Sequence, residues 1–266
     1  MTTTTPRTEV LDAPGPPPPP QRPRRHPVRV VTATACALLG SALLAGAAAT
    51  AWSDHRAAHR PLPPDAAYRQ AASLWRSAPV DSLLPPVLDA PDAGPGGADR
   101  RWTRIALAPD ADCAAALPAA WRTVLSGTGC TRVLRATYTD ATRSSLVTVG
   151  LVFTPADAGA MAALRGRLTV PPAYEYADAR RAAWTATVSA GAPAVVYAVS
   201  AFADGRTVDT PVPAEEAVRE GATGTVAEAG LGHDAKAAAD RVGQALTALA
   251  APDAAPGAAP SKGAAR

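Results

Sequence analysis

The chain of 266 residues contains no asparagine, a single isoleucine, and only two lysines among its 26 basic residues. This is the bias of a GC-rich genome rather than a functional adaptation, so an abundance of Ala, Arg or Pro carries no functional argument. Sequence motifs for chemistry are missing as well: there is no CxxC pair, G-x-S-x-G elbow, phosphate loop or dinucleotide fingerprint. The sequence therefore predicts no catalytic residue, no cofactor and no enzyme activity.

Histidine is also scarce. Three of the four histidines lie near the apolar run described next, which leaves His233 as the one imidazole of the region expected to fold. His55 and His59 are four residues apart and would share a helix face, but two ligands without a third do not make a metal site. We therefore expect no metal site, and a surface or capping role for His233.

What the chain does have is a long apolar run, Val30–Trp52. It continues for 23 residues without a charge, which exceeds the roughly 20 needed to cross a bilayer. Arginines crowd its amino-terminal flank, whereas its carboxy-terminal flank mixes Arg56 and Arg60 with Asp54. The positive-inside rule then places the amino terminus in the cytoplasm. We expect a single-pass protein of the plasma membrane, with the lipid bilayer as one partner and the C-terminal domain outside the cytoplasm.

A cleaved signal peptide is the competing interpretation of this run. Ala49-Thr50-Ala51 fits the A-x-A pattern of a cleavage site. The apolar part of a signal peptide typically has only about 7–15 residues, so the length of the run favours an anchor. Within the run, Ala42 and Gly46 form a small-xxx-small pair, a spacing that can support helix pairing in membranes but arises easily by chance in an Ala-rich segment.

Net charge differs between the segments before and after the apolar run. The formal net charge is +3, and residues 1–29 account for it with five arginines against Glu9 and Asp12. Residues 53–266 hold 21 basic and 21 acidic side chains and are formally neutral. No clustered cationic face is evident in the sequence, so we expect no nucleic-acid partner.

Proline, glycine and composition shifts divide the chain into five segments. The amino-terminal segment contains the proline run Pro16–Pro20 and has few apolar side chains to bury. Pro and Gly, which interrupt helices and strands, are frequent again at Asp89–Gly97. The region that follows has enough apolar residues to form one hydrophobic core. The expected segments are a disordered Pro/Arg-rich cytoplasmic part (1–29), a transmembrane helix (30–52), a stalk with a short helix at Asp65–Arg76 (53–99), an extracytoplasmic domain (100–250) and a disordered tail (251–266).

Periodicity within the domain predicts an α+β fold. Alternating or continuous apolar runs mark strands, and apolar residues three and four apart mark helices. Thr154-Pro155-Ala156-Asp157 carries the signature of a helix start, with Thr as the N-cap and Pro at the first helical position. The first six elements have the ferredoxin-like βαββαβ order, followed by an added β-hairpin and a C-terminal helix. The expected elements are strand 102–108, helix 118–125, strands 131–139 and 145–153, a helix from 155, strands 181–190, 194–202 and 206–210, and helix 234–250.

The stretch RATYTDATRSSLVTVGLVFTPADAGAMAAL, Arg135–Leu164, resembles uncharacterised single-pass membrane proteins of Streptomyces-type actinobacteria. The resemblance extends over most of the outer domain and carries no catalytic motif. It implies a membrane location and no particular activity, because a fold alone does not specify function.

Two features of the outer domain are candidate sites. Cys113 and Cys130 are the only cysteines after the apolar run, and an extracytoplasmic compartment oxidises thiols, so we expect a disulfide between them. Tyr174, Glu175 and Tyr176 follow a Pro-Pro pair in a predicted loop. Tyrosines placed together in a loop are typical of contact residues, so these three form a possible partner contact; the alternative is that they cover the edge of the sheet.

Two functional hypotheses remain from the sequence. The first is a non-catalytic binding or accessory domain of the cell envelope, whose expected partner is another envelope or membrane protein. The second is a cell-wall-acting hydrolase tethered to the surface. A hydrolase of the two-carboxylate type needs acidic groups close together. The hydrolase hypothesis therefore expects one pocket to bring together at least two of Asp110, Asp140, Glu175, Asp178 and His233.

Overall fold

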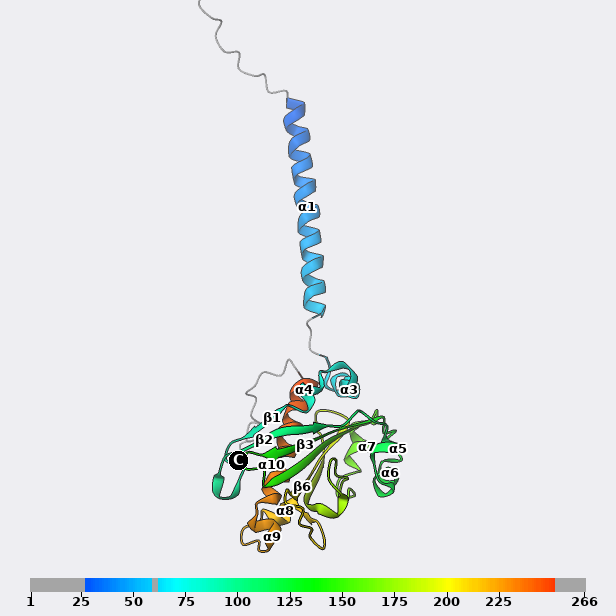
Figure 1. Cartoon of the computed structure of the whole chain (residues 1–266). Helices are drawn as coiled ribbons and strands as arrows, with labels where there is room; N and C mark the ends of the chain where they lie inside the picture. The colour runs from blue at the N-terminus through cyan, green and yellow to red at the C-terminus, as the bar shows by residue number, and fades with distance from the viewer. Residues whose placement is uncertain (1–26, 59–61, 252–266) are drawn as a thin grey trace, which may run out of the picture. The chain divides into compact units, whose positions relative to one another are not determined.

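The computed structural model describes residues 27–58 and 62–251. The chain divides into two compact units, Met1–Arg60 and Pro61–Arg266. The first unit contains a single described element, helix α1 (Pro27–Ala58), which is 32 residues long (Figure 1). The expected apolar run lies within this helix.

Helix α1 is long and apolar enough to cross a membrane. Its apolar window, Cys36–Arg56, has 21 residues and a mean hydropathy of 1.5. Four leucines on it expose between 67% and 75% of their surface, and Trp52 exposes 61%. Such surface is unfavourable in water and favourable in lipid. The same length and composition suit a signal sequence, so both interpretations of the run remain open.

The second unit, called the folded unit below, is an α+β structure built on a mixed seven-stranded sheet. Every pairing is antiparallel except that between β5 and β7. The central strands β4 and β6 are almost wholly buried, because helices and loops cover both of their faces. In spatial order the strands are β1 (Val87–Ala90), β2 (Arg100–Leu107), β3 (Arg132–Asp140), β4 (Ser145–Phe153), β6 (Ala194–Phe202), β5 (Arg181–Val188) and β7 (Val212–Pro213).

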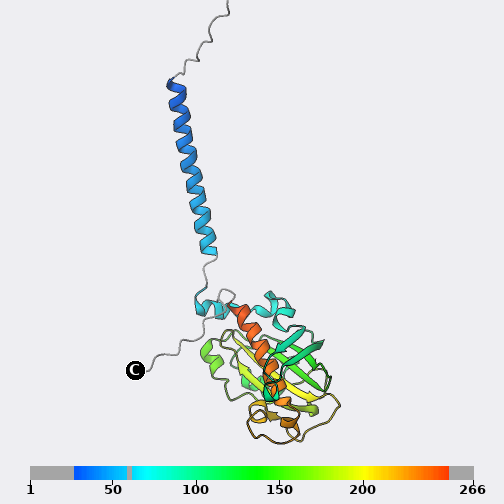
Figure 2. The same cartoon turned by 90° about the vertical axis from the view of Figure 1, so that its left-hand side faces the viewer.

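Alternation along the strands divides the interior between the two faces of the sheet. On one face, side chains such as Val149 and Leu151 pack in the same cluster as Val242 and Leu246 of the long helix α10 (Leu231–Ala250). Figures 1 and 2 show α10, coloured orange to red, lying along the sheet. The shorter helices are α2 (Pro64–Ala71), α3 (Leu74–Ser77), α4 (Val80–Leu83), α8 (Ala214–Ala217), α9 (Thr225–Glu228) and the 3-10 turns at Pro95–Gly97 and Asp178–Arg180.

The opposite face of the sheet carries a second cluster. Val152 and Tyr197 pack there with Trp121 and Met161 from the short helices that cover this face. These helices are α5 (Cys113–Ala116), α6 (Ala119–Leu125) and α7 (Ala158–Ala162). The expected helix 118–125 is therefore present, with Pro118 as its N-cap.

The strand order does not confirm the ferredoxin-like arrangement. In a split βαβ unit, two strands joined through a helix run parallel with a third strand inserted between them. β4 and β5 meet this description, because α7 connects them and β6 lies between them. β2 and β3 do not, since they are direct antiparallel neighbours with Trp102 opposite Asp140. The fold thus contains one split unit within a sheet that is otherwise mostly a meander.

Two expected elements differ in the structure. Residues 206–210 do not form a strand; β6 pairs instead with β5 and β4, and β7 lies at Val212–Pro213. The helix expected from Pro155 begins at Ala158, because Asp157 accepts the capping hydrogen bond from the backbone N–H of Ala160 at 2.8 Å. Thr154 instead accepts from the N–H of Ala156, two residues along.

The segment expected to form a stalk contributes to the folded unit. Leu83 and Leu84 are fully buried in the α10-side cluster, and Ala71 and Leu88 join them there. Strand β1 extends the sheet beside β2. The folded unit therefore starts near residue 61 rather than near residue 100. The sequence did not predict this, because the few buried apolar residues lie in an Ala-rich and Pro-rich segment.

Candidate functional site

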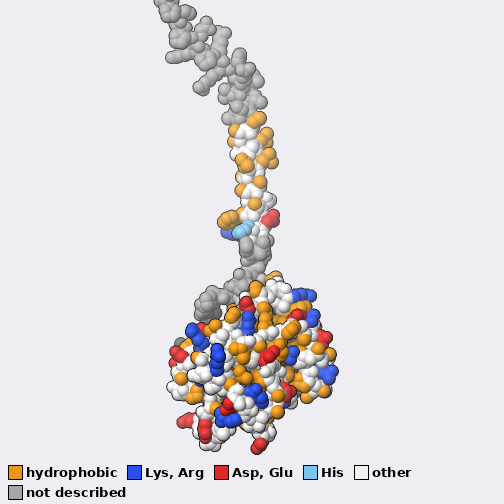
Figure 3. Space-filling view, in the orientation of Figure 1, with side chains coloured by type: hydrophobic (Ala, Val, Ile, Leu, Met, Phe, Trp, Pro, Cys, Tyr) orange, Lys and Arg blue, Asp and Glu red, His pale blue; other side chains and the backbone are white. Residues whose placement is uncertain are grey.

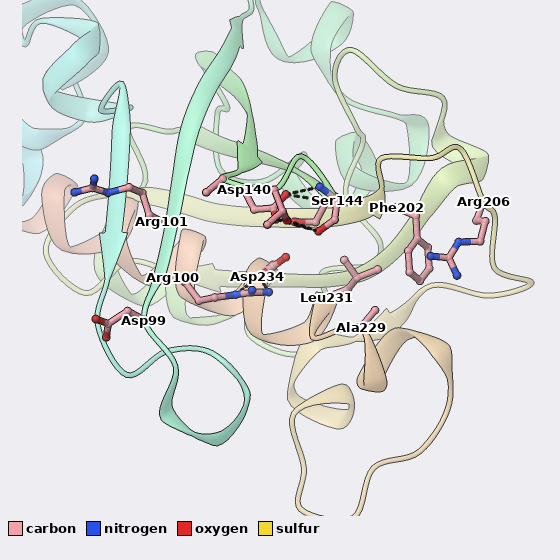
Figure 4. A pocket seen from close by; sticks show the side chains of 13 residues that line it. Asp99, Arg100, Arg101, Asp140, Ser144, Phe202, Arg206, Ala229, Leu231 and Asp234 are labelled. Atoms are coloured by element: carbon pink, nitrogen blue, oxygen red, sulfur yellow. Dashed lines mark hydrogen bonds and ion pairs between the residues drawn. The ribbon is translucent and has the colours of Figure 1, made fainter.

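A polar cavity opens beside the first turn of α10, where β2 begins and the β3–β4 turn ends. Its volume is about 470 Å³, which lies within the range of about 300–1,000 Å³ typical of ligand cavities. Figure 4 shows the side chains that line it, with Asp234 and Arg100 below the Asp140–Ser144 turn and Phe202 and Arg206 at the far side. The cavity thus joins parts of the chain that lie more than 100 residues apart.

An ion pair between Arg100 and Asp234 forms the floor of the cavity. The guanidinium Nε and Nη2 of Arg100 both donate to Asp234 Oδ1, at 2.9 and 2.5 Å. The carboxylate is completely buried, whereas the Arg100 side chain is one-quarter exposed. Burial raises the pKa of Asp234 above its ordinary 3.8, and the attraction of Arg100 opposes this shift without cancelling it. The pair fastens β2 to α10.

Asp140 organises the turn above this ion pair. Its Oδ1 accepts from the backbone N–H groups of Ser144 and Ser145, both at 2.8 Å. Its Oδ2 accepts from the hydroxyls of Thr142 and Ser144. Burial of Asp140 raises its pKa, but these hydrogen bonds favour the charged form and outweigh burial, so the pKa lies below 3.8. With four donors, this carboxylate has a structural role in the β3–β4 turn.

An apolar wall and an exposed cationic rim complete the cavity. Phe202, Leu231 and Ala229 supply the wall. The guanidinium of Arg206 lies over the Phe202 ring, 4.0 Å from its centroid. Arg206 also pairs with Asp204 at 2.8 Å, and both of these side chains are more than half exposed. The cavity is therefore suited to a small polar ligand with one apolar side.

The hydrolase hypothesis needs at least two of its five named groups in one pocket, but the wall of this cavity contains only Asp140 of that set. Asp110 pairs with Arg132 at 3.5 Å. Asp178 accepts from the backbone N–H of Ala173 at 3.0 Å, and His233 Nδ1 donates to the carbonyl of Ala93 at 3.0 Å. Within the described residues there is no group of three or more His, Cys, Asp or Glu that could hold a metal ion.

Sequence analysis missed Asp234, which is the acid that does lie beside Asp140. An acid in the first turn of a helix has an ordinary explanation, the helix dipole, so Asp234 gave no separate signal. Its partner Arg100 is 134 residues away. No local pattern links the two, because their contact depends on how α10 crosses the sheet.

The three residues of the possible partner contact occupy a loop that is fastened to the sheet. The backbone N–H of Tyr174 donates to Thr148 Oγ1 at 3.1 Å, and its carbonyl accepts from Thr137 Oγ1 at 2.6 Å. The Tyr176 hydroxyl donates to the carbonyl of Val199 at 2.7 Å, and burial raises its pKa to about 12. Glu175 is exposed and has a φ of 67°. Glu175 thus faces solvent, the partly buried Tyr174 ring lies 5.3 Å from the guanidinium of Arg135, and Tyr176 is anchored.

The structure contains the expected disulfide between Cys113 and Cys130. Their Cα atoms are 6.2 Å apart, within the normal range for a disulfide. The two cysteines can approach each other because Pro118 separates α5 from α6. Cys113 therefore lies in the short helix α5 and not at the start of one long helix that would carry it away from Cys130. The bond joins α5 to the chain just before β3.

Comparison with known proteins adds no family to these observations. No family model matches the chain, and searches of curated proteins and of solved structures find no match.

Proposed function

We propose that this chain is a membrane-anchored protein whose folded unit acts outside the cytoplasm as a non-catalytic binding or accessory domain of the cell envelope. Helix α1 is the observation that carries the proposal, because its 21-residue apolar window exposes two-thirds or more of the surface of each of four leucines. A bilayer removes that surface from water. The orientation rests on the arginines that precede the helix. The disulfide of the folded unit fits an oxidising compartment.

The face of the folded unit seen in Figure 3 supports a partner that is not a polyanion. On this face, Lys and Arg side chains are mixed with Asp and Glu side chains, and hydrophobic side chains lie between them. Such a surface suits recognition of a protein or a small molecule better than recognition of nucleic acid, which needs a clustered cationic face. The partner we propose is another envelope or membrane protein, contacted through Tyr174 and Glu175.

Protease treatment of intact cells tests the topology. External protease should remove the folded unit and leave residues 1–29 protected. Recovery of a soluble form that begins near Trp52 would contradict the anchor and support the cleaved signal peptide.

Crosslinking in membranes tests the partner. The wild-type chain should capture a specific envelope protein, and Glu175→Gln with Tyr174→Ala should reduce that capture while leaving stability almost unchanged. A matched control is Asp240→Asn, which removes a charge from an exposed i,i+4 pair on α10. Equal capture by all three chains would contradict the proposed contact.

A surface-tethered hydrolase is the second candidate, and one observation favours it. Asp140 and Asp234 share the cavity, and their surroundings displace their pKa values in opposite directions, as in acid–base pairs of enzymes. A hydrolase would release soluble fragments from purified cell-wall material, and Asp234→Asn would abolish this release. Absence of any release by the folded wild-type chain would eliminate this candidate.

A further inference from the structure

The floor of the cavity contains two polar atoms without a hydrogen-bond partner. Asp234 Oδ2 and Ser145 Oγ are both buried, and neither has a partner with good hydrogen-bond geometry, although Ser145 lies close enough to Asp234 to act as a donor to it. Figure 4 shows the second oxygen of Asp234 pointing away from Arg100, toward the Asp140–Ser144 turn. The Ser145 hydroxyl favours the charged form of Asp234, but a carboxylate oxygen has room for more than one donor. A buried acceptor left unpaired costs about 1–3 kcal/mol, so this oxygen is a place where a ligand donor would be favourable.

The interior of the cavity carries an excess of negative charge. Asp140 and Asp234 lie near enough for Asp140 to raise the pKa of Asp234, and Arg100 pairs with Asp234 on the floor. Toward the opening, Arg101 and Arg206 are largely exposed and their partners, Asp89 and Asp204, are exposed as well. Exposed ion pairs contribute little and exchange readily. The exposed Asp99 also lines the cavity, so its three acids and three arginines balance formally, with Asp140 and Asp234 inside and the exchangeable cations Arg101 and Arg206 toward the opening.

We propose that this cavity binds the ammonium end of a small zwitterionic molecule, an amino acid or a short peptide with a free amino terminus. The ammonium group would donate to Asp234 Oδ2 and Ser145 Oγ, and the ligand carboxylate would lie toward Arg101 and Arg206. A small side chain would contact Phe202 and Leu231. This site deepens the binding role proposed above, but its test requires neither the membrane topology nor the protein partner.

An ammonium group fits the floor better than a metal ion or a neutral polyol does. A metal ion of the Ca²⁺ or Mg²⁺ type takes at least six oxygen ligands, whereas the Oδ1 of Asp234 and all of Asp140 are already occupied by protein donors. A polyol would supply donors but would leave the excess charge uncompensated. An ammonium group supplies three donors and one positive charge.

The test measures binding of dialanine and two blocked forms to the full-length protein in detergent micelles, by calorimetry at low salt. Dialanine should bind saturably. N-acetyl-dialanine, which lacks the ammonium group, should bind at least about tenfold more weakly, a difference of 1.4 kcal/mol. Dialanine amide, which lacks the carboxylate, should lose affinity by a smaller factor.

Two variants locate the site. Ser145→Ala removes a buried hydroxyl without a well-formed hydrogen bond, so it should weaken dialanine binding several-fold without a large fall in the unfolding temperature. Asp234→Asn should abolish binding, and its fold is verified by circular dichroism. Asp240→Asn on the same helix is the control and should bind as the wild type does. Failure of dialanine to saturate, equal binding of the acetylated form, or an unchanged affinity in Ser145→Ala together with Asp234→Asn would each overturn the proposal.

Discussion

The ring of Tyr197 lies directly against the backbone of Gly150, its cross-strand partner in the β4–β6 pair. A methyl group added at Gly150 would come 2.2 Å from Tyr197 Cζ. The ring has little freedom to move, because it also packs edge-on against Trp121, with centroids 5.3 Å apart. This contact sets how closely the helices on that face approach the sheet.

Gly150→Ala should therefore destabilise the folded unit by about 1–3 kcal/mol, the usual cost of overpacking a core. Chemical unfolding of the full-length chain measures it. Gly127→Ala is the matched control, because a Cβ there meets nothing within 4 Å. An unchanged unfolding free energy in Gly150→Ala would show that the ring is free to move aside.

Removing one partner of the Arg100–Asp234 pair should lower the unfolding free energy more than replacing both partners with apolar residues. Asp234→Ala leaves a largely buried guanidinium unpaired, so we expect a loss of about 3–5 kcal/mol, whereas Arg100→Met with Asp234→Leu should lie closer to the wild type. A double-mutant cycle from unfolding curves gives the coupling. Additive single losses would contradict a direct interaction.

Asp140 should make the unfolding free energy depend on pH in the acidic range. Its folded pKa lies below the ordinary 3.8, so the folded state binds its proton less tightly than the unfolded state does. The stabilisation it provides is complete above pH 3.8 and is lost as the pH falls through the folded pKa. Unfolding of the wild type and of Asp140→Asn, followed from pH 7 to acid, should differ by about 1–3 kcal/mol at neutral pH and converge in acid. A constant difference would contradict this assignment.

Removing the disulfide should weaken the folded unit. Cys113 and Cys130 are 17 positions apart, and a closed loop of that size corresponds to about 3 kcal/mol in the chain-entropy model. Cys113→Ala with Cys130→Ala should lower the unfolding free energy by about this amount. Cys36→Ala is the control, since Cys36 is exposed and free. Two alkylatable thiols after residue 100 in the natively exported wild type would show that the bond does not form.

The two tyrosines of the candidate contact should behave differently. Tyr176→Phe removes the hydrogen bond to Val199, so we expect a loss of about 1 kcal/mol. Tyr174→Ala keeps the backbone hydrogen bonds to Thr137 and Thr148, so its stability should change little. Thermal unfolding distinguishes the two. A large loss in Tyr174→Ala would mean that its ring is part of the core and not a contact surface.

The sequence by itself determined the features that depend on local or compositional signals. An uncharged run of 23 residues required a long apolar helix, and α1 contains it. Alternating or continuous apolar runs predicted strands at 131–139, 145–153 and 194–202, and the two cysteines after the apolar segment predicted their bond. The helix and the strands depend on residues that are close in sequence. The disulfide follows because only two cysteines come after the apolar run.

Only the tertiary structure decided how the strands are ordered and where the cavity lies. The pairing of β2 with β3, the insertion of β6 between β4 and β5, and the burial of Leu83 and Leu84 depend on contacts between distant segments. Asp234 illustrates the reason: in sequence it is an ordinary acid in the first turn of a helix. The path of α10 across the sheet places it against Arg100 and below Asp140, where its second oxygen is buried without a partner in hydrogen-bonding geometry.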